Sequence, residues 1–243
     1  MSKVTLYQFM PLPDATPQVS FSPFCVKLEA YLILTGRAYE TRGGIPPFTP
    51  TGTLPYMSYN NKIIGDSQAI IEKMESENKD KNSGLLYKTL GESSLSPEQQ
   101  ALSLEIRELV ETKLYFSALY SRYATDEGWK YAIEGIKFGM PRILWCCLPN
   151  LIRALQIEKC KTHGCTSDDT AFQNVGVWLN RVTEVLGDKP FLFGAEPHVA
   201  DCSLFGFLIL AKGDRHKNPI TKAVKENYQL MDFVARMARL LKI

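Results

Sequence analysis

Strand-like and helix-like patterns occupy separate parts of this 243-residue chain. Alternation of apolar and polar residues, the pattern of a β-strand, is found near the N-terminus, at about 4–9, 38–41 and 54–64. Beyond residue 97 helical spacing takes over, in segments at about 97–123, 143–162, 168–186, 199–212 and 228–241. This division predicts a small α/β domain followed by an all-helical domain.

The first part of the chain shows the order β-α-β and then β-β-α. Ser22 is a typical N-cap for a helix that begins at Pro23, and Gly36 suits the position just after its end. Between about residues 76 and 98 the composition shifts to Lys, Asn, Glu, Ser and Gly, which is typical of a linker. We therefore predict an α/β domain over 1–78, a linker over 79–96 and a helical domain over 97–243.

Charge and hydropathy narrow the class of protein. The 28 basic and 26 acidic residues give a net charge of +2, and no basic block indicates a nucleic-acid or anionic-lipid partner. The chain starts without the apolar core of a signal peptide, and its most apolar run, 143–148, is too short to span a bilayer. We expect a cytoplasmic protein with six reduced cysteines. Within this run, Cys146 and Cys147 beside Trp145 are predicted to lie in the core.

The segment from Cys160 to Cys165 contains two cysteines and His163, which are residue types that bind zinc. A structural zinc site needs four ligands, and no second pair lies near this one. We interpret the segment as a helix end with Gly164 as its stop, and we predict no metal site.

Three short motifs follow one another in the first domain: S-P-F-C at 22–25, T-L-P-Y at 53–56 and G-D-S-Q-A-I-I at 65–71. With them the chain resembles the thioredoxin-like N-terminal domain of the glutathione transferase superfamily, and F-L-F-G-A-E-P-H-V-A-D-C at 191–202 resembles that superfamily's helical-domain signature. The stretches S-P-F-C-V-K-L-E-A-Y-L and G-D-K-P-F-L-F-G resemble the branch that contains failed-axon-connections and metaxin-like proteins. The resemblance implies the glutathione transferase fold, and a homodimer is expected on the same basis.

What the resemblance implies for function is a site for the tripeptide thiol glutathione. In such domains the residue before a cis-proline offers its backbone to the cysteinyl part of glutathione, and here those residues are Leu54 and Pro55. Asp66 and Ser67 would hold the γ-glutamyl end, with a helix N-terminus favouring its carboxylate. The alternative is that Asp66 and Ser67 only cap a helix and that Leu54-Pro55 is only a turn.

Ser22 is the predicted activator of the glutathione thiol. In redox relatives with a C-P-x-C turn the first cysteine is the nucleophile, but here Ser22 takes that position and Cys25 the second, so a dithiol cycle is disfavoured. Lowering a thiol pKa by about 2 units is worth roughly 2.7 kcal/mol. A hydrogen bond to a charged group contributes about 1.5–3 kcal/mol and a helix N-terminus about 0.3–1 kcal/mol, so the two suffice. Cys25 is expected to be structural, with a catalytic role as the alternative.

Three tyrosines are further candidates. Tyr7 ends the first strand, where some glutathione transferases have an activating tyrosine, although an aromatic residue in a strand is more often packing. Tyr115 and Tyr120 lie on the helix that lines the acceptor pocket in the resembled fold, and the alternative for both is core between the domains.

Two functions are therefore open. The first is a glutathione transferase that adds the activated thiolate to an apolar electrophilic small molecule. The second is a protein with the same fold that has lost the chemistry and acts in protein–protein interaction. An interaction module would need none of Ser22, Pro55, Asp66 and Ser67, so their presence together favours the enzyme.

Overall fold

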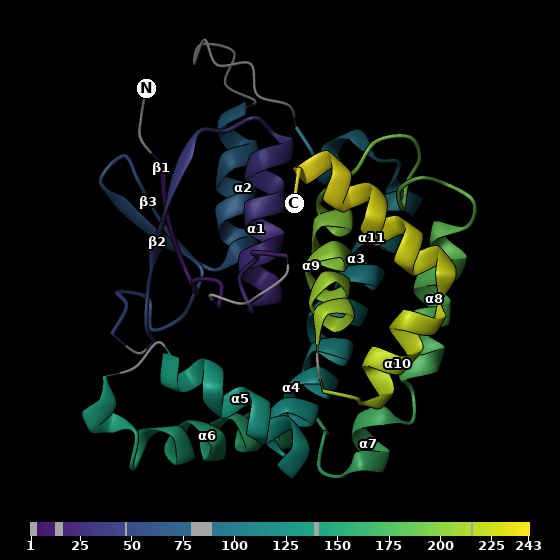
Figure 1. The fold of residues 1–243 in the computed structure, drawn as a ribbon. Coiled ribbons are helices and arrows are strands. Elements are labelled where there is room, and N and C mark those ends of the chain that lie inside the picture. Colours follow the sequence, from purple (N-terminus) through teal and green to yellow (C-terminus); the bar gives the residue numbers. More distant parts are fainter. Residues whose placement is uncertain (1–3, 13–16, 47, 79–88, 139–140, 215) are drawn as a thin grey trace.

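The computed structural model describes residues 4–12, 17–46, 48–78, 89–138, 141–214 and 216–243. Its N-terminal part contains a four-stranded sheet in the order β2-β1-β3-β4, with helices α1 and α2 side by side on one face (Figure 1). Strand β1 runs parallel to β2 and antiparallel to β3, and β3 runs antiparallel to β4. The bounds are β1 Val4–Gln8, α1 Pro23–Leu34, β2 Tyr39–Gly43, β3 Tyr56–Tyr59, β4 Lys62–Gly65 and α2 Ser67–Asn78.

Local turn chemistry explains where these elements end. Gly36, with φ of +73°, follows the end of α1, and its N–H donates to the carbonyl of Ile33. Asn60 and Asn61 join β3 to β4 with φ of 50° and 59°, the left-handed pair that a type I′ hairpin requires and that Asn tolerates. The predicted βαβ-ββα order is confirmed.

The remainder of the described chain is helical, as predicted. Its elements are η2 Glu92–Ser94, α3 Pro97–Glu108, the π-helix η3 Leu109–Leu114, α4 Tyr115–Tyr123, α5 Asp126–Phe138, η4 Arg142–Leu144, α6 Leu148–Thr162, α7 Asp168–Phe172, α8 Val175–Leu186, α9 Val199–Gly213, α10 Pro219–Glu226 and α11 Tyr228–Leu241. None of the helices in these described ranges has the length and apolar character that a bilayer crossing requires.

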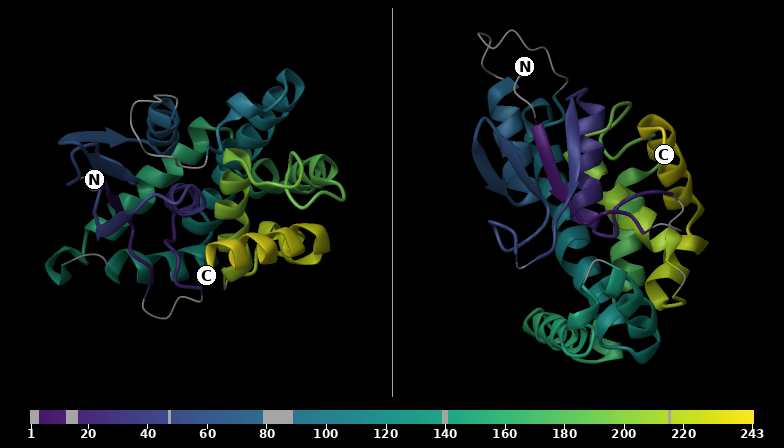
Figure 2. Two further views of the ribbon diagram at one scale, coloured as in Figure 1. Left: turned by 90° about the horizontal axis from the view of Figure 1, so that it is seen from above. Right: turned by 60° about the vertical axis from the view of Figure 1, so that its left-hand side comes forward.

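Helix α9 joins the two parts of the molecule. It is buried along nearly its whole length and lies beside α1 in both Figure 1 and Figure 2. The contact is close: a Cβ atom at Gly206 would lie 2.5 Å from the carbonyl oxygen of Pro23. One hydrophobic cluster runs from the sheet through α1 to α9 and α11. Helix α1 is therefore held between the sheet on one side and the helical part on the other.

Some details of the helical part differ from the sequence-based expectation. Helices α5 and α10 were not predicted, and the segment 168–186 is two helices rather than one. Cys146 and Cys147 are exposed, so their predicted place in the core was wrong. They precede α6, which begins only at Leu148, and they lie at an outer tip of the molecule. The linker prediction falls partly on 79–88, outside the described residues, and the domain boundaries stay a prediction.

Candidate functional site

Strand register brings the candidate residues of three separate segments to one edge of the sheet. Tyr7 of β1 pairs with Tyr56 of β3, and Tyr56 pairs with Gly65 of β4. Pro55 immediately precedes Tyr56, and the Leu54-Pro55 peptide bond is cis. Asp66 immediately follows Gly65. The end of β1, the cis-proline and the start of α2 therefore lie next to one another.

The start of α2 is capped by Asp66, which has φ of +67°. Its Oδ1 accepts hydrogen bonds from the backbone N–H groups of Gln68 at 2.8 Å and Ala69 at 3.0 Å. The Asp66 residue is exposed, whereas Ser67 is buried. Asp66 thus does cap the helix, and it also places a carboxylate at the solvent side of this edge.

The start of α1 presents Ser22. Ser22 is the N-cap residue in extended conformation, and its side chain does not bond to the first backbone amides of the helix. The hydroxyls of Ser22 and Ser20 instead interact with the thiol of Cys25, as does the backbone of Phe9. This last contact connects the start of α1 to the end of β1. Ser22 is half-buried, between the solvent side of the edge and the buried thiol.

Cys25 lies one turn inside α1 and is fully buried. Burial raises the pKa of its thiol, and this effect outweighs the hydrogen bonds that lower it. A buried, protonated thiol is a poor nucleophile, so this geometry fits a structural residue.

Lys27 is a member of this region that the sequence analysis missed. Its ammonium group is buried and lies 2.6 Å from Oε1 of Glu111 in the π-helix η3 and 3.0 Å from Oε1 of Gln68 in α2. Ser203 of α9 donates to the same Glu111 oxygen. The group therefore ties the starts of α1 and α2 to the helical part. The available signal was a lysine among the apolar residues at the start of α1.

The three candidate tyrosines lie in different surroundings. The ring of Tyr7 stacks on Tyr56, with centroids 4.4 Å apart and planes at 6°. Tyr115 packs edge-on against Phe24 of α1 at 4.9 Å, and burial raises the pKa of its phenol to about 12. Tyr120 lies apart from both, against Phe172 of α7.

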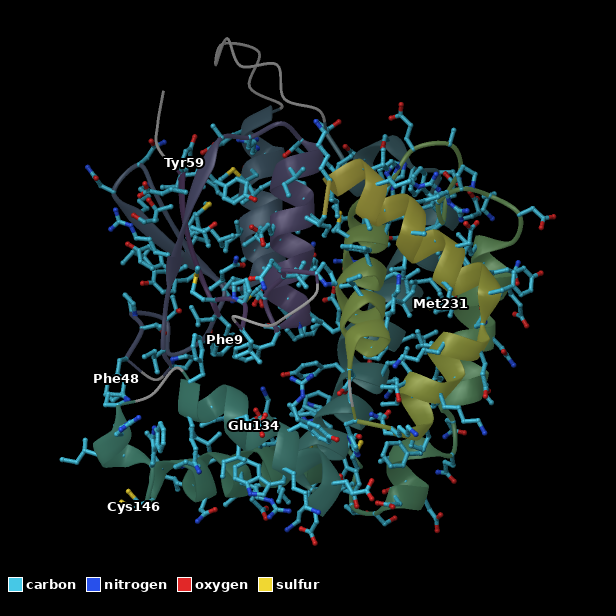
Figure 3. The ribbon with its side chains drawn as sticks, in the orientation of Figure 1. Phe9, Phe48, Tyr59, Glu134, Cys146 and Met231 are labelled. Carbon is cyan, nitrogen blue, oxygen red and sulfur yellow. The ribbon has the colours of Figure 1, made fainter. Side chains whose placement is uncertain are left out.

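A cavity of about 390 Å³ opens between the two parts of the molecule. Its walls come from the loop before α1 and from α4, α5 and α9, including Leu12, Phe21, Tyr131, Glu134 and Leu210. A second cavity of about 50 Å³ adjoins it, shares Arg122, Leu210 and Asp214, and reaches Pro23 and Tyr115. Phe21 and Pro23 flank Ser22, so both cavities reach the start of α1. In Figure 3, Phe9 and Glu134 lie on opposite sides of this region.

His216 provides the cavity with a buried imidazole. Its Nδ1 lies 3.4 Å from Oγ of Ser121, and its Nε2 lies 3.8 Å from a carboxylate oxygen of Glu127. The ring also stacks on Tyr131 at 6.1 Å. The sequence analysis missed His216 and α5 together, because neither belongs to the recognised motifs.

Comparison with known proteins agrees with this geometry. Residues 23–128 match the family model of the glutathione S-transferase N-terminal domain, and residues 178–237 match that of the C-terminal domain. The chain belongs to the glutathione S-transferase superfamily. The superfamily and the fold predicted from the motifs are thereby confirmed.

Two relatives show the range of the superfamily that this chain resembles. It is 27% identical over 217 residues to the isoprene-epoxide glutathione S-transferase of Rhodococcus sp. (strain AD45), covering 84% of this chain and 85% of that protein. It is 29% identical over 221 residues to Failed axon connections of Drosophila melanogaster, covering 84% of this chain but only 49% of the relative. The predicted likeness to the failed-axon-connections branch is confirmed, although this chain spans about half of that protein's length.

Solved structures share the fold. A glutathione S-transferase of Ceriporiopsis subvermispora in complex with glutathione superposes with a TM-score of 0.63 over 99% of this chain and 98% of that one, at 13% identity. At this identity the match supports the fold only.

Proposed function

We propose that this protein is a glutathione transferase that binds reduced glutathione at the sheet edge formed by Pro55, Asp66 and the start of α1. The observation that carries the proposal is the register that brings Pro55 and Asp66 together at the end of β1, with a cis bond before Pro55. The start of α1 joins them through the contact of the Cys25 thiol with the backbone of Phe9. The family membership and the fold support it.

In this proposal the backbone of Leu54 pairs with the cysteinyl part of glutathione, next to cis-Pro55. Asp66 and Ser67 hold the γ-glutamyl end at the start of α2. The exposed carboxylate of Asp66 suits the α-ammonium group, and the helix N-terminus suits the α-carboxylate.

Ser22 would stabilise the glutathione thiolate by donating its hydroxyl hydrogen. Two observations support this role: the hydroxyl is not used as a helix cap, and it already lies beside a sulfur atom, that of Cys25. Cys25 is buried and the pKa of its thiol is raised, so in this proposal the thiol contacts the Ser22 hydroxyl and does not attack the substrate.

The acceptor would enter the cavity of about 390 Å³, whose lining is mostly apolar with a few polar groups. Tyr115 of α4 lines the adjoining smaller cavity beside Phe24 at the start of α1, whereas Tyr120 packs against Phe172 of α7, so we propose only Tyr115 as a contact. An epoxide, the electrophile named for the Rhodococcus relative, is the acceptor we would test. In that reaction the thiolate sulfur bonds to carbon, the carbon–oxygen bond breaks, and the alkoxide takes a proton. In this proposal His216, which lines the same cavity, supplies this proton.

Calorimetric titration of reduced glutathione into the whole protein tests the binding site. We expect saturable binding in the micromolar to low-millimolar range, with no detectable heat for Asp66→Ala. Because this variant also loses a helix cap, Ser96→Ala is the matched control: Ser96 caps α3 through the N–H of Gln99, outside the site. The control should retain binding.

The role of Ser22 has its own readout. In Ser22→Ala the pKa of bound glutathione, measured from the ultraviolet absorbance of the thiolate, should rise by about 1–2 units. Ser20→Ala is the control, because the Ser20 hydroxyl also contacts Cys25 but is fully buried. An unchanged thiol pKa in Ser22→Ala would remove Ser22 from the mechanism.

The second candidate function is a non-catalytic interaction protein, which the similarity to Failed axon connections favours. It predicts no heat from glutathione even at several millimolar. A homodimer and a cytoplasmic location are proposed on the basis of the superfamily and of six free thiols.

A further inference from the structure

Helices α5 and α6 lie at an outer end of the molecule (Figure 1). Large apolar side chains are exposed there. We call this surface the α5–α6 tip and define it by Phe138, Ile143, Trp145, Leu151 and Leu155. All five are exposed, and Ile143 exposes 84% of its surface. Leu151 and Leu155 are one helical turn apart and therefore share a face of α6. Figure 3 shows Cys146 of the same segment pointing outward from the fold.

The tip is also cationic. Between Glu134 and Glu158 the sequence contains no acidic residue, although the whole chain has 26. Lys137 and Arg142 lie over the ring of Trp145, at 5.5 Å and 5.6 Å from its centroid. The acidic residues around this stretch are engaged elsewhere: Glu134 lines the cavity of about 390 Å³, Glu158 pairs with Lys161, and Asp126 at the start of α5 pairs with Arg153 of α6. The positive charge of the tip therefore comes from the absence of carboxylates in this stretch, and it does not require a block of basic residues.

A second copy of the chain would not complement this surface. A two-fold contact places the same patch of both copies face to face, so Lys137 and Arg142 of both copies would lie within one interface. No carboxylate of the segment 135–157 would separate them. A surface of anionic lipid headgroups has the opposite charge and accepts apolar side chains beneath it.

We propose that the α5–α6 tip is a peripheral docking surface for an anionic membrane. Ile143, Leu151 and Leu155 enter the boundary between headgroups and acyl chains, and Trp145 lies at the headgroup level, which suits an aromatic ring with a polar N–H. Lys137 and Arg142 bind headgroup phosphates. This surface is separate from the proposed glutathione site and does not depend on it.

Sedimentation with vesicles tests the proposal on the whole protein. We expect binding to phosphatidylcholine vesicles that contain phosphatidylserine, with a blue shift of tryptophan emission. The double variant Ile143→Ser/Trp145→Ser should bind at least about tenfold more weakly, because two apolar anchors are lost. Lys137→Gln/Arg142→Gln should bind about 25-fold more weakly, about fivefold for each basic residue.

Val177→Ser is the matched control for the apolar variant. Val177 is an exposed apolar residue of α8, outside the tip, so its loss should leave vesicle binding unchanged. Far-ultraviolet circular dichroism and urea unfolding of each variant check that the fold is retained.

Three results would overturn the proposal. The first is a wild-type protein that does not bind the anionic vesicles, and the second is binding that is unchanged in Ile143→Ser/Trp145→Ser. The third is concentration-dependent dimerisation in analytical ultracentrifugation that this variant abolishes, which would assign the tip to a second copy.

Discussion

The contact between α1 and α9 makes Gly206 the position whose substitution tests the fold most directly. A Cβ atom there would lie 2.5 Å from the carbonyl oxygen of Pro23, whereas carbon and oxygen in contact are about 3.3 Å apart. Gly206→Ala must therefore separate the two helices locally by about 0.8 Å. Overpacking of this kind costs about 1–3 kcal/mol, against about 1 kcal/mol gained from the helix propensity of alanine. We expect a net destabilisation of up to about 2 kcal/mol.

Gly176→Ala in α8 is the control, because a Cβ atom there meets no other atom within 4 Å. It should stabilise the protein by up to about 1 kcal/mol. Urea unfolding of both variants, with slopes compared to exclude a change in the unfolded state, gives the two values. If Gly206→Ala is as stable as Gly176→Ala, the close approach of α1 and α9 is not a constraint and the reasoning fails. Because Pro23 follows Ser22, we also expect a raised pKa of bound glutathione in Gly206→Ala but not in the control.

Three further predictions concern buried and exposed side chains. Lys27→Ala leaves Glu111 partly buried without its cation, so it should lower the unfolding free energy in urea by about 3–5 kcal/mol. Most of this loss should be recovered in Lys27→Met/Glu111→Leu. A loss below about 1 kcal/mol would contradict the buried pair. Burial raises the pKa of the Asp201 carboxyl from 3.8 to about 7, so the folded state binds this proton more tightly than the unfolded state. The resulting stabilisation is complete below about pH 4 and is lost as the pH rises to about 7. The unfolding free energy of wild type minus that of Asp201→Asn should therefore fall over this interval. A difference that does not change with pH would refute the pKa shift. Cys146 and Cys147 are exposed and the other four cysteines are buried, so a thiol reagent should titrate two thiols in the folded protein and six after unfolding, and any other ratio would contradict the burial pattern.

The N-terminal part of the fold could be predicted because its signals are local. A proline after Ser22, a glycine at 36 and the pair Asn60–Asn61 each specify a backbone conformation regardless of what packs on it. Helix α10 was missed although Asn218 caps it through the N–H of Thr221, since a helix of 8 residues gives too short a pattern. Helix α5 starts with two acidic residues, but it was missed because only the longer helical segments on either side of it were assigned.

The placement of the site could be predicted only in part. The motifs identify Ser22, Pro55 and Asp66, but the proximity of Pro55 and Asp66 comes from strand register, which the sequence specifies weakly. The cavity needed the missed helix α5 and residue His216, so it could not be inferred. Cys146 and Cys147 were assigned to the core because they lie in an apolar run, and hydropathy does not distinguish a core from an exposed apolar surface.

The interdomain cavity takes one wall from the loop before α1, through Leu12, Pro17, Val19 and Phe21, and its other walls from the helical part. In an enzyme built this way, the loop can gain or lose residues without moving the cis-proline or the start of α2. Lineages that share the same thiol chemistry are then free to diverge in the molecules they accept, and for engineering this loop is the place to vary first.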